Sequence, residues 1–221
     1  MHTTFSRLSP TIVMAILAMP VLMIGQTAER SRTQGLKETD QFVKASETTS
    51  QAITNGKMEL QKTLGAYNTL VTQPSKDMKG DYKKLLKSSD SMNAKVASAQ
   101  QKIEAMQKSG DTYFSGRAET IKSIQDAPLQ SQARERLTAS QKEFAGVLES
   151  LREAGRALEP FRKQLADQIT FLGSDLTPSA MTTLKPQADK LNTQGAEVFS
   201  KTDGALAKGT AYFQGLRASR T

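Results

Sequence analysis

The sequence predicts an all-α protein: an elongated, antiparallel, up-down four-helix bundle with coiled-coil-like packing, preceded by an N-terminal signal segment. Three observations lead to this prediction. Apolar residues recur at helical spacing along four long segments. Prolines and glycines separate these segments at short connections, which make consecutive helices antiparallel neighbours. Only 37% of the 221 residues are hydrophobic and 5% are aromatic, so we expect a thin, aliphatic core.

The N-terminal segment has the pattern of a secretory signal. A short basic head, MHTTFSR, precedes the apolar run TIVMAILAMPVLMIG at residues 11–25. This run is shorter than the roughly 20 residues that a helix needs to span a bilayer. We therefore predict a signal peptide over residues 1–28 and a single helical domain over residues 29–221. The alternative is an uncleaved anchor in the inner membrane, formed by residues 11–25. Either alternative places the protein in the periplasm or cell envelope.

The residue inventory excludes several kinds of catalytic site. The chain has no Cys, and its one His, His2, lies within the predicted signal peptide. A mature chain without either residue type cannot form a Ser/His/Asp triad, a Cys/His pair or a histidine-ligated metal site. Carboxylates such as Glu149 and Glu153 alternate with Arg152 and Arg156, which is typical of a solvated, salt-bridged helix face. We therefore predict no enzyme, no cofactor and no metal site.

The first two helices follow from apolar spacing and one turn-forming stretch. Residues 37–73 carry a helical pattern of apolar residues, namely Phe42, Ile53, Leu60, Leu64, Tyr67 and Leu70. The stretch PSKDMKGD at residues 74–81 interrupts it, and Asp81 is the expected cap of a second helix over residues 81–125. Two rows with a seven-residue period follow that helix. They are Tyr82, Val96 and Ile103, and Leu85, Met92, Ala99, Met106 and Tyr113.

The third helix, predicted over residues 127–173, carries the strongest pattern in the chain. Its main row recurs every seven residues and consists of Leu137, Phe144, Leu151, Leu158, Leu165 and Leu172. Asp126 is the expected cap, and Pro128 fits the first turn. Such a row can pack within one chain or against a second chain in a coiled coil. Four comparable rows in one chain favour packing within the chain.

The fourth helix is predicted to begin with Thr177 as its cap and Pro178 at its first position. Its main row is Leu184, Leu191, Val198, Ala205 and Tyr212. A second row is rich in small residues, which allow close approach of a neighbouring backbone. It comprises Met181, Ala188, Gly195, Thr202, Gly209 and Leu216.

Two prolines fall inside the predicted helices, Pro160 in the third and Pro186 in the fourth. Proline removes a backbone donor and its ring clashes with the preceding turn, so it bends a helix unless packing compensates. Two interpretations stay open. The prolines are bends that keep curved helices in contact, or they are hinges at which the bundle opens.

The net charge is positive but evenly spread. Residues 1–25 contain only one charged residue, Arg7, so the formal charge of +8 falls to +7 without them. The densest cluster, Lys83, Lys84 and Lys87, is accompanied by no nucleic-acid-binding motif. We therefore expect no nucleic-acid partner and at most weak attraction to an anionic membrane surface or envelope polymer.

The run LEPFRKQLADQITFLGSDLTPSAMTTL, residues 158–184, resembles an uncharacterised bacterial family, number 2959 among the domains of unknown function. The shared features are a Glu-Pro step, an Asp a turn later, an aromatic-Leu pair and a Leu-x-x-x-Ala turn. Here they correspond to Glu159 and Pro160, Asp167, Phe171 and Leu172, and Leu176 with Ala180. The similarity extends over residues 42–216. It implies an exported, long-helix protein, and it implies no activity and no catalytic residue.

Together these patterns predict a non-enzymatic structural or protein-interaction module of the bacterial cell envelope, with an unidentified envelope protein as its partner. The alternative is an amphipathic-helix binder of anionic membrane or envelope polymer, which opens at the two prolines. The stability of the closed bundle distinguishes the two hypotheses.

Overall fold

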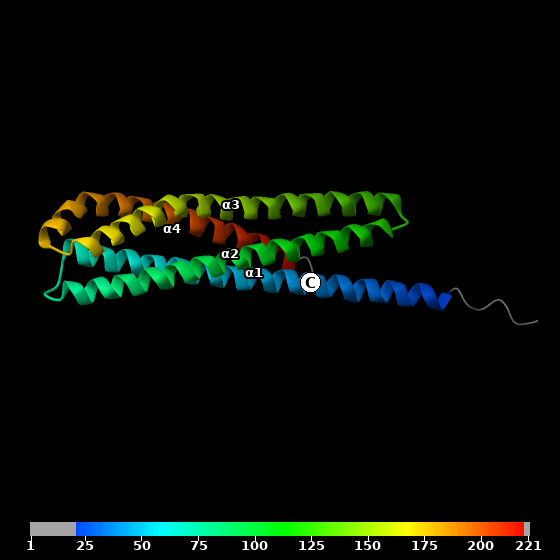
Figure 1. The fold of residues 1–221 in the computed structure, drawn as a ribbon. Coiled ribbons are helices and arrows are strands. Elements are labelled where there is room, and N and C mark those ends of the chain that lie inside the picture. Colours follow the sequence, from blue (N-terminus) through cyan, green and yellow to red (C-terminus); the bar gives the residue numbers. More distant parts are fainter. Residues whose placement is uncertain (1–20, 219–221) are drawn as a thin grey trace, which may run out of the picture.

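The computed structural model describes residues 21–218, and side chains from residue 33 onward, as four long helices (Figure 1). Helix α1 spans Val21–Thr72, α2 Met78–Lys122, α3 Ala127–Ser174 and α4 Pro178–Ala218. Helices of 41 to 52 residues are about 60 to 80 Å long. Each helix packs on its neighbours in chain order, and α4 packs back onto α1. The predicted all-α, up-down four-helix bundle is confirmed.

The two ends of the bundle differ. The connections 73–77 and 175–177 lie together at one end, which we call the closed end (Figure 1). The connection 123–126 lies at the other end, which we call the open end. There α4 stops short of the α2–α3 connection, whereas the start of α1 extends beyond it (Figure 1). The open end is therefore the end with fewer helices around its axis.

Helix α1 begins at Val21, sixteen residues before the predicted start at Lys37. The Ser- and Thr-rich sequence is helical all the same, and its hydroxyls bond to backbone carbonyls of the preceding turn. Thr39, for example, donates to the Gly35 carbonyl at 2.7 Å. Residues 1–20 lie outside the described residues, so the signal peptide over residues 1–28 stays a prediction. Within the described part of the chain, no helix is both long and apolar enough to cross a membrane.

Helix α2 begins at Met78, and its cap is Asp77 rather than the predicted Asp81. The Asp77 carboxylate accepts a hydrogen bond from the backbone N–H of Gly80 at 2.9 Å. Asp81 lies in the first turn, where its carboxylate is 3.0 Å from the Lys84 ammonium. The prediction was wrong because both aspartates suit a helix start, and the chain enters helical geometry at the earlier one.

The other two caps are confirmed. Asp126 accepts a hydrogen bond from the backbone N–H of Leu129 at 2.9 Å at the start of α3. Thr177 accepts one from the backbone N–H of Ala180 at 3.3 Å at the start of α4. Each satisfies one of the free donors of a first helical turn.

Helices α1 and α2 share the most extensive interface, and small residues hold it together. The α1 residues recur every seven positions and are Thr49, Gly56 and Thr63. They face three α2 backbone carbonyls at the same spacing. Thr49 donates to the Lys102 carbonyl at 2.9 Å, and Thr63 lies 3.0 Å from the Ser88 carbonyl. A Cβ at Gly56 would lie 3.8 Å from the Lys95 carbonyl, at ordinary van der Waals distance.

The core consists of two clusters along the bundle axis. The aliphatic cluster fills the closed end around Tyr67 and Phe161. The aromatic cluster, toward the open end, gathers rings from all four helices, namely Phe42, Tyr113, Phe114, Phe144, Tyr212 and Phe213. These are six of the 8 Phe and 4 Tyr residues of the chain. The expectation of an aliphatic core therefore holds for one cluster and is wrong for the other.

The seven-residue row of α3 runs through both clusters. Phe144, Leu151, Leu165 and Leu172 are buried, whereas Leu137 and Leu158 are half-buried. Both half-buried leucines border a hollow in the bundle. Pro160 and Pro186 lie within α3 and α4, and both helices continue through them.

Candidate functional site

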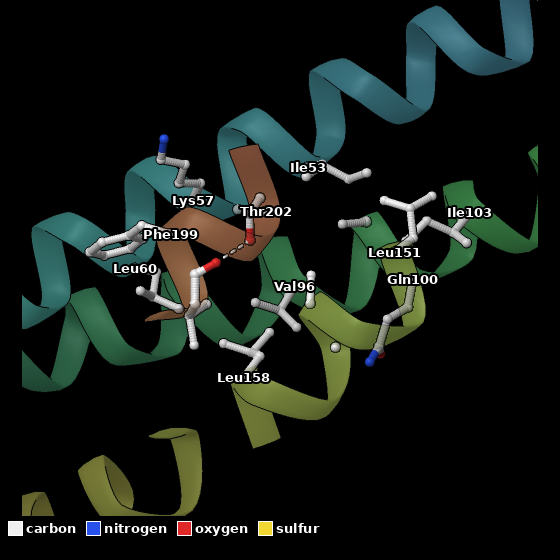
Figure 2. A pocket seen from close by; sticks show the side chains of 15 residues that line it. Ile53, Lys57, Leu60, Val96, Gln100, Ile103, Leu151, Leu158, Phe199 and Thr202 are labelled. Atoms are coloured by element: carbon white, nitrogen blue, oxygen red, sulfur yellow. Dashed lines mark hydrogen bonds between the residues drawn. The ribbon is translucent and has the colours of Figure 1, made fainter. Parts of the chain in front are cut away.

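A small hollow, which we call the central cavity, lies between the two core clusters. It has a volume of about 90 Å³ and takes its walls from all four helices (Figure 2). Ile53 and Leu60 of α1, Val96 of α2 and Leu158 of α3 supply apolar side chains. Small residues leave the space open, and they are Gly56, Ala99, Ala154 and Gly155.

The polar groups around the central cavity are mostly engaged with other partners. Thr202 donates to the carbonyl of Val198 in its own helix at 2.7 Å, the bond drawn in Figure 2. The Lys57 ammonium lies 2.6 Å from the Asp203 carboxylate, so its charge is balanced. An engineered apolar cavity of about 150 Å³ stays dry and takes up benzene. The central cavity is smaller, so we interpret it as a packing gap.

The central cavity lies next to one of the two candidate hinges. Pro160 follows the cavity-lining Leu158 by two residues and leaves the Arg156 carbonyl without its usual helical donor. Both prolines adjoin the aliphatic cluster, since the fully buried Phe161 follows Pro160, and Leu184 and Ala188 flank Pro186. Of the two, Pro160 is the one that lies within two residues of a residue lining the central cavity.

A larger hollow, which we call the end groove, lies at the open end between α2, α3 and α4. Its volume is about 670 Å³. Its origin is the length of α4. The Tyr212 hydroxyl lies 2.9 Å from the Ser140 hydroxyl, so these residues are level in two antiparallel helices. Ala218, the last described residue of α4, is then level with Arg134, and the first turns of α3 have no α4 beside them.

The end groove has an apolar floor and charged groups at its rim. Ile121 is buried, and Leu137 and Leu216 are half-buried. The rim carries one carboxylate and two guanidinium groups, all exposed, from Glu143, Arg117 and Arg136. The hollow is therefore amphipathic.

Both arginines of the end groove lack a carboxylate partner. The Arg117 guanidinium carbon lies 5.6 Å from the centre of the Tyr113 ring, a cation–π contact. Within residues 33–218, neither Arg117 nor Arg136 has a carboxylate within 4.0 Å. By contrast, Arg156 donates to the exposed Glu149 at 2.7 Å and holds the pKa of that carboxyl below its usual range. The predicted salt-bridged face at Glu149 is therefore confirmed.

The inner end of the groove is formed by tyrosines of the aromatic cluster. Burial raises the pKa of Tyr212 to about 12, and the nearby Glu143 carboxylate acts in the same direction. The Tyr212 hydroxyl is therefore neutral at physiological pH and remains available to share a hydrogen bond with Ser140.

The described residues contain no group of three or more His, Asp or Glu side chains that could hold a metal ion. Of the predicted α3 row, Leu151 and Leu158 line the central cavity and Leu137 lines the end groove, while the rest of the row and both prolines line neither. The end groove was missed by the sequence patterns. The available signal was Leu129, a large apolar residue in the first turn of α3 that belongs to no seven-residue row and is 57% exposed.

The sequence profile of a family described as "Protein of unknown function (DUF2959)" matches residues 27–216, which include all but the ends of the four-helix bundle. The chain belongs to this family. The resemblance noted at residues 158–184 is thereby confirmed, and the family description assigns no activity to any residue of the bundle. No curated protein and no solved structure matches the chain.

Proposed function

We propose that this protein is a non-enzymatic interaction module of the cell envelope, a stiff helical rod that presents polar faces to another envelope protein. The observation that carries the proposal is the closed bundle. The apolar rows of the four helices pack against one another, and large apolar side chains are exposed only singly among residues 33–218, at Leu36, Met58, Leu86, Leu129 and Phe171. A rod of this kind is suited to spacing or scaffolding, because its ends lie about 60 to 80 Å apart.

The envelope location is supported by the basic head and the apolar run at residues 11–25. The test is N-terminal sequencing of the protein from fractions of its host cell. A first residue between Gln26 and Arg30 in a soluble envelope fraction is the expected result. An intact Met1 in the membrane fraction would indicate an uncleaved anchor and not a cleaved signal peptide. An intact Met1 in the cytosol would contradict the proposed envelope location.

The interaction role is tested with a photo-cross-linking amino acid placed at exposed positions along the rod. Leu129 at the open end, Met58 near the middle and Phe171 at the closed end are exposed, so the replacement leaves the core intact. A partner held on one face should give a discrete cross-linked product from one or two of these positions in living cells. Absence of a discrete product from every position contradicts the proposal.

A second candidate function, binding to a lipid surface by an opened bundle, is favoured by the central cavity that lies two residues from Pro160. Pro160→Ala restores a backbone donor and so favours a closed bundle. For a rod, binding to liposomes with anionic headgroups should be weak, lost at moderate salt and unchanged by Pro160→Ala. Pro186→Ala is the matched control within the aliphatic cluster. Salt-resistant binding that Pro160→Ala abolishes and Pro186→Ala leaves intact favours the opening mechanism instead.

A further inference from the structure

We propose that the end groove is a binding site for a single-chain anionic amphiphile, a hydrocarbon chain with a carboxylate or phosphate head. This goes beyond the role as a rod and does not depend on it. Small-molecule sites are usually concave, mostly apolar and about 300 to 1,000 Å³ in volume. The end groove, at about 670 Å³, falls within that range, whereas the central cavity does not.

The floor of the groove suits a hydrocarbon chain. Apolar side chains come from three helices, Ile121 of α2, Leu137 of α3 and Leu216 of α4. Small residues keep the floor wide, since a Cβ added at Gly215 of α4 would meet no atom within 4 Å. At the mouth, Leu129 keeps 57% of its surface in water. A bound chain would remove that apolar surface from water, which is favourable.

The rim of the groove suits an anionic head. Arg117 comes from α2 and Arg136 from α3, and neither is neutralised by a carboxylate in the described residues. Guanidinium groups bind carboxylates and phosphates through charge-assisted hydrogen bonds. Glu143 is the one acidic residue among those that line the groove. The balance is one positive charge, which favours an anion over a neutral or cationic head.

Calorimetric titration of the purified full chain tests the site. The probes are dodecanoate and dodecyl phosphate, with dodecyltrimethylammonium as the cationic counterpart and acetate and inorganic phosphate as heads without a chain. Both anionic amphiphiles should saturate a single site. The cationic amphiphile should bind about tenfold more weakly, since it loses charge-assisted bonds, and the heads alone should give no heat. Binding of inorganic phosphate as strong as that of dodecyl phosphate overturns the assignment of a hydrocarbon site.

Two variants identify the groove. Arg117→Gln combined with Arg136→Gln should weaken dodecanoate binding about tenfold and abolish its preference over dodecyltrimethylammonium. The melting temperature should fall only slightly, because both arginines are exposed and the change removes one cation–π contact, that of Arg117 with Tyr113. Leu129→Glu places a carboxylate at the mouth and should likewise weaken binding. Met58→Glu is its matched control, because Met58 is 53% exposed and lies outside the groove.

Three results would overturn the proposal. The first is equal binding of anionic and cationic amphiphiles. The second is binding that the double arginine variant and Leu129→Glu leave unchanged. The third is binding to vesicles of anionic phospholipid without binding of dodecanoate, which would assign the open end to a membrane surface and not to a single amphiphile.

Discussion

The closed and open ends of the rod are held together by different kinds of contact. At the closed end, hydrogen bonds between helices cross an aliphatic core. Tyr67 of α1 donates to the buried Gln168 of α3, and Tyr82 of α2 donates to the Ile169 carbonyl at 3.2 Å. Such bonds are satisfied in one register of the helices only, so they fix how the helices align.

At the open end, ring packing replaces most of these bonds. Six aromatic rings fill the space between four helices, and Phe42 has centroid distances of 4.9 to 6.4 Å to each of the other five. The large rings fill the volume between all four helices, and α4 contributes two of them, Tyr212 and Phe213. The comparison indicates that hydrogen bonds at the closed end fix the alignment of the helices. At the open end, ring packing stabilises the bundle beside the amphipathic groove.

The largest expected effect comes from removing the ring at the centre of the aromatic cluster. Phe42 is fully buried, so Phe42→Ala should cost about 3–5 kcal/mol of unfolding free energy through lost contacts and a new cavity. Urea denaturation measures the loss. Phe171→Ala is the control, because Phe171 is 38% exposed, and its effect should be much smaller. Equal losses for the two variants would show that the rings do not form a cooperative core.

Alkaline pH should weaken both ends through their buried tyrosines. Burial raises the pKa of Tyr67 above its usual range and that of Tyr212 to about 12. Because these folded-state pKa values exceed the unfolded value of about 10, the tyrosines contribute stability below pH 10 that is lost as the pH rises toward 12. The urea midpoint should fall over this interval, and less steeply in Tyr67→Phe combined with Tyr212→Phe. If the urea midpoint of the double variant falls as steeply with pH as that of the wild type, the loss of stability arises from groups other than these two tyrosines.

At neutral pH, Tyr67→Phe isolates the hydrogen bond of the closed end. The change keeps the ring but leaves the Gln168 side-chain oxygen, in a side chain only 6% exposed, without its donor. A buried acceptor that loses its partner costs about 1–3 kcal/mol. Tyr82→Phe is the comparison, because its carbonyl partner is already used within α3. A smaller loss for Tyr67→Phe than for Tyr82→Phe would mean that Gln168 finds another donor.

Much of the bundle could be predicted because seven-residue rows report a long-range regularity. Four of the six members of the α3 row are buried in the core, as predicted. The caps Asp126 and Thr177 were identified from short sequence patterns. Small residues were expected to allow close approach of a neighbouring backbone to α4. At Gly195 the near neighbour is instead a side chain, because an added Cβ would lie 2.8 Å from a Leu64 methyl of α1.

The contacts between helices and the end groove could not be predicted, because they depend on which helix faces face each other. The spacing of apolar residues along one helix does not contain this information. Thr49 and Thr63 belong to none of the predicted apolar rows, yet they bond to α2 carbonyls in the most extensive interface. Phe42 and Phe213 lie far apart in the chain, and only the register of four helices brings their rings to 4.9 Å. The end groove likewise follows from the level at which α4 ends relative to α3, which is a property of the whole bundle.

Two glycines inside helices, Gly110 of α2 and Gly155 of α3, compare the tightly packed aromatic cluster with the central cavity. Gly110→Ala has the larger expected effect. A Cβ at Gly110 would lie 2.6 Å from the Phe144 ring and 3.1 Å from the Phe42 ring. Overpacking costs about 1–3 kcal/mol, and the better helix propensity of Ala returns up to about 1 kcal/mol. Gly110→Ala should therefore destabilise the protein by about 1–2 kcal/mol in urea. A stabilising effect would show that the aromatic cluster can rearrange.

The smallest expected effect has the opposite sign. Gly155 lines the central cavity, and a Cβ added there would meet no atom within 4 Å. Gly155→Ala therefore introduces no clash, reduces the freedom of the unfolded chain and adds a methyl group beside an open space, so it should stabilise the bundle by about 0.5–1 kcal/mol. Gly204→Ala, at an uncrowded helical position outside the cavity, measures the propensity gain alone. Any excess for Gly155 is the contribution of filling the cavity, whereas a destabilising Gly155→Ala would mean that α2 and α3 approach more closely in solution and that no packing gap exists beside Pro160.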